Sequence, residues 1–259
     1  MNVLFIGDIV GSSGRLIIKE NLGRLKEEHA IDVCVANAEN SAAGLGLTGS
    51  IARELYAYGI DMITMGNHTW SKNELLHSID SDDRIARPAN GAPSWPGKGF
   101  CVKDTPFGPF IVMNFLGRVG MDPANCPFEI ADLMVDDLKT RFDTRMTLID
   151  FHAEATSEKQ AFGRYFDGRV SLVVGTHTHV QTADETIFER GTGFITDVGM
   201  TGPIDSVIGM ETNHSIQRFV ERIPVPYMVA KGPSMMSFIV AAIDEKTGRT
   251  TEIQRMCIR

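Results

Sequence analysis

Short apolar runs alternate with segments of helical periodicity along the first 80 residues. Strands are predicted where the apolar runs fall, at Val3–Ile6, Asp32–Ala36 and Asp61–Met65. Leucines and isoleucines at helical spacing predict helices between and after them, over residues 15–28, 50–58 and 72–79. Because strands that alternate with helices usually form a parallel sheet covered by those helices, this part is expected to adopt an α/β fold.

The rest of the chain adds elements of both kinds. Two apolar runs, 100–102 and 110–115, flank a Pro- and Gly-rich stretch and predict a hairpin. Further helices are predicted over 128–142 and 157–165, and buried strands over 146–151 and 170–174. From Thr186 onward, short apolar runs broken by glycine predict antiparallel strands, which end with 236–243 and 250–256. We expect mixed sheets with helices outside, in a single domain spanning residues 1–259.

Composition limits the kind of ligand and the compartment. The formal net charge of −8 gives no electrostatic footprint for duplex nucleic acid, so small phosphorylated ligands fit better. The four cysteines form no CxxC pair, which indicates reduced thiols and a cytoplasmic location. The apolar N-terminal run is too short for a membrane span and lacks the basic flank of a signal peptide.

Metal-capable side chains follow five of the predicted strands. In open α/β folds, ligands bind beyond the carboxyl ends of strands, so segments distant in sequence converge there. A lone histidine or aspartate after a strand is usually a hydrogen-bonding cap, but five such strand ends together favour a metal site. The side chains concerned are Asp8, Glu39, Asn40, Asn67, His68, His152, His177 and His179. The remaining histidines, His29, His77 and His214, are interpreted as structural.

The chemistry of this set points to phosphate-ester hydrolysis. Oxygen and imidazole ligands without thiolate suit manganese, iron or zinc in an open site better than a structural zinc site. A central carboxylate can bridge two ions, which together can generate a hydroxide at neutral pH and stabilise the attacking and leaving oxygens at phosphorus.

Three further features allow two interpretations. The glycine-rich stretch 11–14 could cradle phosphate at a helix N-terminus, but it lacks the lysine of a P-loop and is more typical of a turn and helix cap. Residues 41–48 could form a wall of the site, since they follow Glu39 and Asn40. Arg118 could contact a substrate phosphate, although a surface ion pair is the commoner fate of such a residue.

The arrangement resembles the calcineurin-like metallophosphoesterases, whose motifs are matched by Gly7-Asp8, Glu39, Gly66-Asn67-His68, His152 and His177-Thr178-His179. Val10 stands where that family has histidine, Glu39 replaces the bridging aspartate, and Thr69 replaces an acid. These departures, with the runs Gly-Asp-Ile-Val-Gly-Ser-Ser-Gly-Arg and Asn-Ala-Glu-Asn-Ser-Ala-Ala-Gly, resemble the YmdB-like branch along almost the entire chain.

The resemblance implies a four-layer α/β-sandwich and a phosphodiesterase acting on cyclic nucleotides, including 2′,3′-cyclic nucleotides, with two iron or manganese ions; zinc is a further candidate. It implies that Asp8, Glu39 and His179 hold one ion and that Asn67, His152 and His177 hold the other with Glu39 as the bridge. Asn40 would contact an ion or a phosphate oxygen. His68 would be the general acid, which requires its protonated form.

Other functions remain open from the sequence. The same metal pair could serve a phosphomonoesterase or 5′-nucleotidase, since the shape of the pocket decides between mono- and diesters. A regulatory protein could use the site to sense a phosphorylated ligand, and stoichiometric binding without product would identify it. The chain could act as a monomer or as a homo-oligomer.

Overall fold

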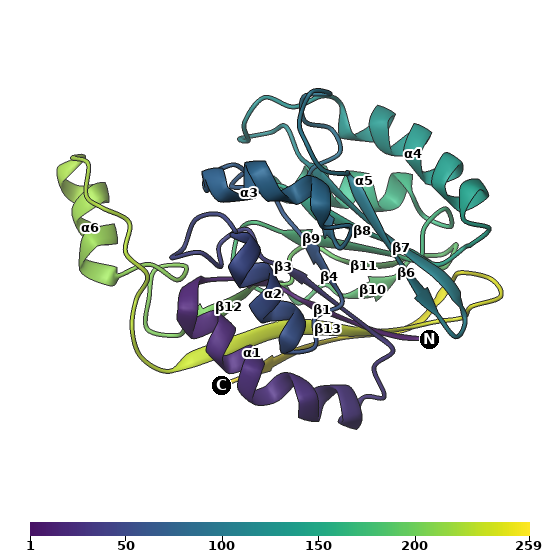
Figure 1. The fold of residues 1–259 in the computed structure, drawn as a ribbon, viewed down its shortest axis with the longest axis horizontal. Helices are drawn as coiled ribbons and strands as arrows, with labels where there is room; N and C mark the ends of the chain where they lie inside the picture. The colour runs from purple at the N-terminus through teal and green to yellow at the C-terminus, as the bar shows by residue number, and fades with distance from the viewer.

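The computed structural model describes residues 1–259 as two β-sheets that face each other with helices on their outer sides (Figure 1). The larger sheet has the order β2-β12-β13-β1-β3-β4-β5, with β14 beside β13. Its strands are β1 (Asn2–Ile6), β2 (Asp8–Ile9), β3 (Val33–Asn37), β4 (Met62–Thr64), β5 (Ile85–Ala86), β12 (Met200–Pro203), β13 (Ser234–Ile243) and β14 (Thr250–Ile258).

The smaller sheet has the order β10-β11-β9-β8-β7-β6. Its strands are β6 (Phe100–Thr105), β7 (Gly108–Leu116), β8 (Thr147–His152), β9 (Leu172–Thr176), β10 (Thr186–Ile187) and β11 (Gly193–Ile195). The helices are α1 (Gly11–Glu28), α2 (Gly49–Ala57), α3 (Asn73–Ser78), α4 (Pro127–Arg141), α5 (Thr156–Tyr165) and α6 (Thr212–Glu221), with a 3-10 turn at Ile79–Ser81. No helix is both long and apolar enough to cross a bilayer.

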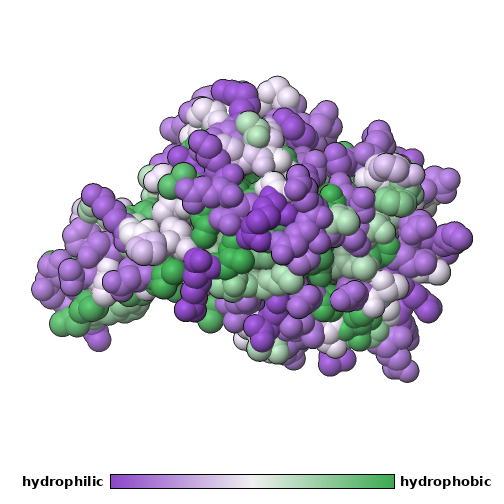
Figure 2. Space-filling model, turned by 90° about the horizontal axis from the view of Figure 1, so that it is seen from below, coloured by the Kyte–Doolittle hydropathy of each residue, from purple (hydrophilic) through white to green (hydrophobic).

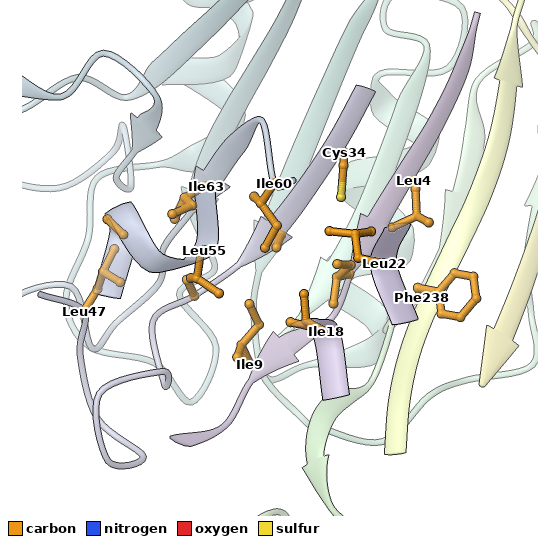
Figure 3. Close-up of a cluster of buried hydrophobic side chains, with 14 of the residues drawn as sticks. Leu4, Ile9, Ile18, Leu22, Cys34, Leu47, Leu55, Ile60, Ile63 and Phe238 are labelled. Atoms are coloured by element: carbon orange, nitrogen blue, oxygen red, sulfur yellow. The ribbon is translucent and has the colours of Figure 1, made fainter. Parts of the chain in front are cut away.

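Alternation along β1 explains why both faces of the larger sheet are apolar. Val3 and Phe5 belong to the core between the two sheets. Leu4 points to the other face, where it packs with Ile18 and Leu22 of α1 (Figure 3). Because successive side chains of a strand point to opposite faces, a strand buried on both sides has a continuous apolar sequence.

The smaller sheet has the same organisation. Ile111 and Phe151 lie on its outer face, where they join the cluster formed with α4 and α5. The ring of Phe162 on α5 stacks on that of Phe151, with centroids 4.1 Å apart and planes 8° from parallel. Two sheets covered by helices on both outer sides form the expected four-layer α/β-sandwich with mixed sheets.

Two expectations about local structure are wrong. The segment after Thr186 is not made only of short strands, because residues 212–221 form α6, which projects from the body at the left of Figure 1. Helix α1 begins at Gly11 instead of residue 15, so stretch 11–14 is its first turn. A Cβ on Gly14 would lie 2.2 Å from the carbonyl oxygen of Thr201, and glycine therefore allows α1 to approach β12 closely.

Parallel pairing brings distant strand ends together. Strands β1, β3 and β4 run parallel in one sheet, and β7, β8 and β9 run parallel in the other. Their carboxyl ends carry the residues singled out as metal-capable, as expected for ligand sites in α/β folds.

Candidate metal centre

Side chains from three strand ends converge on Nε2 of His152, the last residue of β8. This atom lies 2.9 Å from Oε1 of Glu39, 3.0 Å from Oδ1 of Asn67 and 3.1 Å from Nδ1 of His177. Ligand atoms of Glu39, His152 and His177 all lie within 4.8 Å of one another. Ligands about 2.1 Å from one ion are about 3 Å apart at neighbouring octahedral positions, so this spacing fits a shared ion.

A second group of side chains adjoins the first. Nε2 of His179 lies 3.2 Å from Nδ2 of Asn40 and 3.9 Å from Oδ1 of Asp8. The other oxygen of Asp8 accepts a hydrogen bond of 3.2 Å from the backbone N–H of His177. That contact joins the second group to the loop that supplies the first.

Two carboxylate oxygens in the centre have no hydrogen-bond donor. Oδ1 of Asp8 and Oε1 of Glu39 are buried and unpartnered. Nε2 of His152 approaches Oε1 of Glu39 to 2.9 Å without the geometry of a hydrogen bond. Since a buried carboxylate oxygen without a partner is costly, the donor set fits cations at both groups.

Neighbouring polar groups fix the orientation of two imidazoles. The hydroxyl of Thr176 lies 2.9 Å from Nδ1 of His152 and donates to Oδ1 of the buried Asp150 at 2.7 Å. The hydroxyl oxygen therefore accepts from Nδ1 and leaves the lone pair of Nε2 free for a metal. Nδ1 of His179 lies 2.8 Å from the carbonyl oxygen of Ile208, so its Nε2 carries the lone pair, which faces Nδ2 of Asn40.

The electrostatics of the centre favour positive charge. Burial alone would raise the pKa of Glu39, yet His152 and His68 hold it well below its usual range. Burial opposes a charge on His152, but Glu39 and Asp8 outweigh it and raise the pKa to about 9. Burial and the proximity of His152 lower the pKa of His177 to about 3. In the metal-free protein, a proton on His152 thus takes the place of a cation.

The loop that carries His177 and His179 is held in an unusual backbone conformation. Both histidines have positive φ, of 99° and 66°. Between them in the sequence, Thr178 is fixed by the buried Asp197. Oδ2 of Asp197 accepts hydrogen bonds from the backbone N–H of Thr178 at 3.1 Å and from its hydroxyl at 2.8 Å. The same oxygen accepts from Lys159 at 2.7 Å. Such conformations persist where the surroundings determine them, and the Lys159–Asp197 ion pair provides that support.

His68 differs from its neighbours because its imidazole makes no hydrogen bond within the protein. Its backbone N–H donates to Oε2 of Glu39 at 2.7 Å, while the side chain lines a cavity of about 350 Å³. Gly44 and Leu45 of the 41–48 loop form one wall of this cavity, in agreement with the role considered for that loop. Thr69 closes the turn instead, since its hydroxyl donates to the carbonyl oxygen of Gly66 at 2.6 Å.

Several residues of the site were not expected from the sequence. Glu154 lines the cavity, and its Oε2 lies 3.2 Å from Nε2 of His177. Its position two residues after His152, at the same strand end, was an available signal. Ile208, Met210 and Tyr227 add an apolar wall. Arg118 is exposed just beyond β7, makes no ion pair and does not line the cavity.

Comparisons with known proteins agree on one family. The model of the YmdB-like protein family matches residues 4–256. The chain is 46% identical over 258 residues to the 2′,3′-cyclic-nucleotide 2′-phosphodiesterase of Bacillus subtilis, covering all of this chain and 97% of the relative. Its fold superposes on a crystal structure of a hypothetical protein from Thermus thermophilus with a TM-score of 0.93 at 36% identity, covering 100% of this chain and 99% of the other. For a novel phosphatase from Mycoplasma pneumoniae the TM-score is 0.91 at 34% identity, with coverage of 100% and 93%.

Proposed function

The chain belongs to the YmdB-like family, and from this membership and the geometry of the site we propose that it is a metal-dependent phosphodiesterase of small cyclic nucleotides, including 2′,3′-cyclic nucleotides. The observation that carries the proposal is the convergence of Glu39, Asn67 and His177 on one nitrogen of His152. A full-length relative named as a phosphodiesterase supports the reaction class.

In this proposal the centre holds two ions, iron or manganese, with zinc as a further candidate. Asp8, Glu39 and His179 would hold one ion, with Asn40 beside it. Glu39, Asn67, His152 and His177 would hold the other. The unpartnered oxygens of Asp8 and Glu39 support a cation at each group. When bound, two such ions would lower the pKa of water and stabilise negative charge on phosphate oxygens.

The residues around the centre would bind the substrate and move its proton. His68 would donate a proton to the leaving ribose oxygen, since its imidazole lines the cavity and makes no hydrogen bond within the protein. Tyr227, Met210 and Ile208 offer an apolar surface on which a nucleobase can pack. A nucleotide would therefore lie with its phosphate at the polar end of the cavity and its base against this wall.

The test is metal analysis of the purified protein followed by hydrolysis assays. About two transition-metal ions per chain and turnover of 2′,3′-cyclic nucleotides are expected. A relative named as a phosphatase makes monoesters the main alternative, so 5′-nucleotides belong in the same assay. Cleavage of 5′-nucleotides alone would replace the diesterase proposal. Stoichiometric binding of cyclic nucleotides without product would indicate a sensor.

We further infer that the chain forms a homo-oligomer through α6. Ile216, Phe219 and Val220 lie at helical spacing on α6, Ile223 follows just after its end, and Phe219 is 81% exposed. The projecting lobe at the left of Figure 2 carries this apolar surface. With Tyr227 and Met228 the exposed apolar area is on the order of 600 Å², close to one side of a standard interface.

A cytoplasmic location fits the state of the cysteines. All four are free, and Cys34 and Cys101 are buried in the core. Proteins kept in reducing compartments use cysteine in this way.

A further inference from the structure

A second cluster of charged side chains lies at the opposite ends of the strands that carry the metal centre. A cavity of about 350 Å³ opens where β8, β9 and β11 begin and where β13 turns into β14. That turn is drawn in yellow at the right of Figure 1, whereas α6, whose flanking segments line the cavity at the metal centre, lies at the left. With six residues in β8, the two sites are separated by about 20 Å.

The walls of this cavity are strongly basic in a protein of net charge −8. No aspartate or glutamate lines it, and its cationic residues are Lys139, Arg145, Arg169, Arg190 and Arg249. Only Arg169 has acidic partners, Asp132 and Asp136. Five cations from separate segments create a positive potential that attracts anions.

Three of the arginines have unused hydrogen-bonding capacity. The guanidinium groups of Arg145, Arg190 and Arg249 make no ion pair and no hydrogen bond within the protein. A guanidinium carries five N–H donors in a planar fork that matches phosphate oxygens two at a time. Nζ of Lys139 donates to the carbonyl oxygen of Arg169 at 2.8 Å and keeps two further donors.

Glycines lie beside the three exposed arginines. Each of the three arginines lies against a glycine of positive φ, and a Cβ added to that glycine would come within 2.7 Å of an atom of the arginine residue. The pairs are Gly168 with Arg190, Gly191 with Arg249, and Gly248 with Arg145. Three independent loops therefore lack a side chain at the point where an arginine crosses them.

The charges also affect one another. Burial lowers the pKa of Lys139, and Arg169 and Arg145 lower it further against the opposing effect of Asp136. A multivalent anion would relieve this repulsion. The adjoining cavity, of about 400 Å³, shares Lys139 and Arg145, but Asp143 and Glu245 also line it, so the purely basic surface is confined to the first cavity.

We propose that Arg145, Arg190, Arg249 and Lys139 form a binding site for an anion with two or more linked phosphate groups. Separate arginines on three loops suit separate phosphates of one ligand, and the volume fits a compound of the size of a di- or triphosphate. Inorganic polyphosphate and the phosphate chain of a nucleoside triphosphate share this chemistry. The site is independent of the phosphodiesterase proposal, because binding can be measured without turnover.

The test is calorimetric titration of the metal-loaded protein with tripolyphosphate, ATP and AMP at 50 and 150 mM salt. We expect one binding site for tripolyphosphate, with a lower affinity at the higher salt concentration. Arg53 is an exposed arginine outside this cavity, so Arg53→Ala should bind tripolyphosphate as the wild type does. Arg190→Ala and Arg249→Ala should each weaken it by about 10- to 100-fold, and Arg249→Lys should be intermediate. Hydrolysis of bis(p-nitrophenyl) phosphate should be unchanged in these variants.

Comparison of the ligands distinguishes a nucleotide from inorganic polyphosphate and identifies the results that would overturn the proposal. ATP binding tighter than tripolyphosphate would assign the site to nucleotides, and the reverse order would assign it to inorganic polyphosphate; both support the proposal. Equal affinity for AMP and ATP would overturn the requirement for linked phosphates. Retention of tripolyphosphate binding in the Arg190→Ala, Arg249→Ala double variant would place the anion at the metal centre and overturn the site. Binding of a single-stranded oligonucleotide without binding of tripolyphosphate would overturn it as well.

Discussion

The hydroxyl of Thr176 lies 2.9 Å from Nδ1 of His152, and the two residues are direct neighbours in the register of β8 and β9. The same hydroxyl donates to Asp150, so its oxygen can serve only as an acceptor toward the imidazole. Replacement of Thr176 or Asp150 would free His152 to change its tautomer and to turn Nε2 away from the metal.

Thr176→Val should therefore weaken metal binding by about 10- to 100-fold while leaving the fold intact. Activity should return when excess metal is added, because the ligands themselves remain. Metal affinity can be measured by competition with a chelator. Thr192→Val is a matched control, since Thr192 is also buried and its hydroxyl donates to the carbonyl oxygen of Val170 at the other end of the sheet. Equal losses of metal in both variants would contradict a positioning role for Thr176.

The parts of the structure that could be predicted are those determined by local patterns. Asp8, Glu39 and His152 each follow an apolar run, and parallel strands place such positions at one edge of a sheet. The contact between Thr176 and His152 depends on strand register, which no local pattern specifies. Helix α6 was missed because its apolar residues face outward, so its short, partly apolar sequence resembles that of the strands around it.

The basic cavity could not be predicted from the net negative charge of the chain. Net charge is a sum over the chain, but Arg145, Arg190 and Arg249 come from three separate segments that gather only in the folded protein. Their grouping follows from the sheet order β11-β9-β8 and from the hairpin that joins β13 to β14. Charge patterning along the sequence gives no sign of it.

Glu39→Gln should remove most activity and weaken metal binding. An amide oxygen carries no charge to balance the cations, and the amide nitrogen would point a donor at His152 or at the backbone N–H of His68. A loss of both metals on elemental analysis is the expected result, with a circular dichroism spectrum like that of the wild type. Wild-type metal content and rate would mean that Glu39 only caps the turn at His68.

Metal binding should strengthen as the pH rises. The pKa of His152 is raised to about 9 in the metal-free protein, above an unfolded value of about 6.5, so an entering cation must displace its proton. Apparent affinity should increase by up to about tenfold per pH unit between pH 6.5 and 9. The metal-free protein should lose stability over the same window. The stabilisation that protonated His152 provides is fully present below pH 6.5 and is lost as the pH rises through 9.

Chelator competition and thermal unfolding at pH 6.5, 7.5 and 8.5 measure these two trends. Glu39→Gln supplies the control, because the carboxylate that raises the pKa of His152 is then absent and the stability of the metal-free protein should vary less with pH. Unfolding temperatures that stay constant in the wild type over this range would contradict the proposed proton on His152.

Phe219→Asp should convert the proposed homo-oligomer to a monomer. Phe219 is 81% exposed in the isolated chain, so the substitution costs little within one subunit but would bury a charge between two. Light scattering coupled to size-exclusion chromatography gives the mass directly. Leu133→Asp, at a 73% exposed position on α4, should leave the mass unchanged. A wild-type protein that is monomeric at micromolar concentration would remove this proposal.

His68→Ala should separate proton donation from metal binding. His68 shares its loop with Asn67, but its imidazole makes no hydrogen bond within the protein, so its loss should leave both metals and the fold in place. Turnover of a 2′,3′-cyclic nucleotide should fall by about 10²- to 10⁴-fold if protonation of the leaving group limits the rate. His177→Ala should instead lose metal together with activity, because Nδ1 of His177 lies in the ligand cluster.

The leaving group provides the internal control. Nitrophenolate departs readily as an anion, whereas a ribose alkoxide requires a proton, so the His68→Ala defect should be smaller on bis(p-nitrophenyl) phosphate than on the cyclic nucleotide. Both rates are measured at saturating substrate and equal metal content, which removes binding and metal loading from the comparison. A defect of the same size on both substrates would mean that His68 binds the phosphate, and a loss of metal would mean that it is a ligand. Only a smaller defect on bis(p-nitrophenyl) phosphate at full metal content agrees with an imidazole that protonates the departing oxygen.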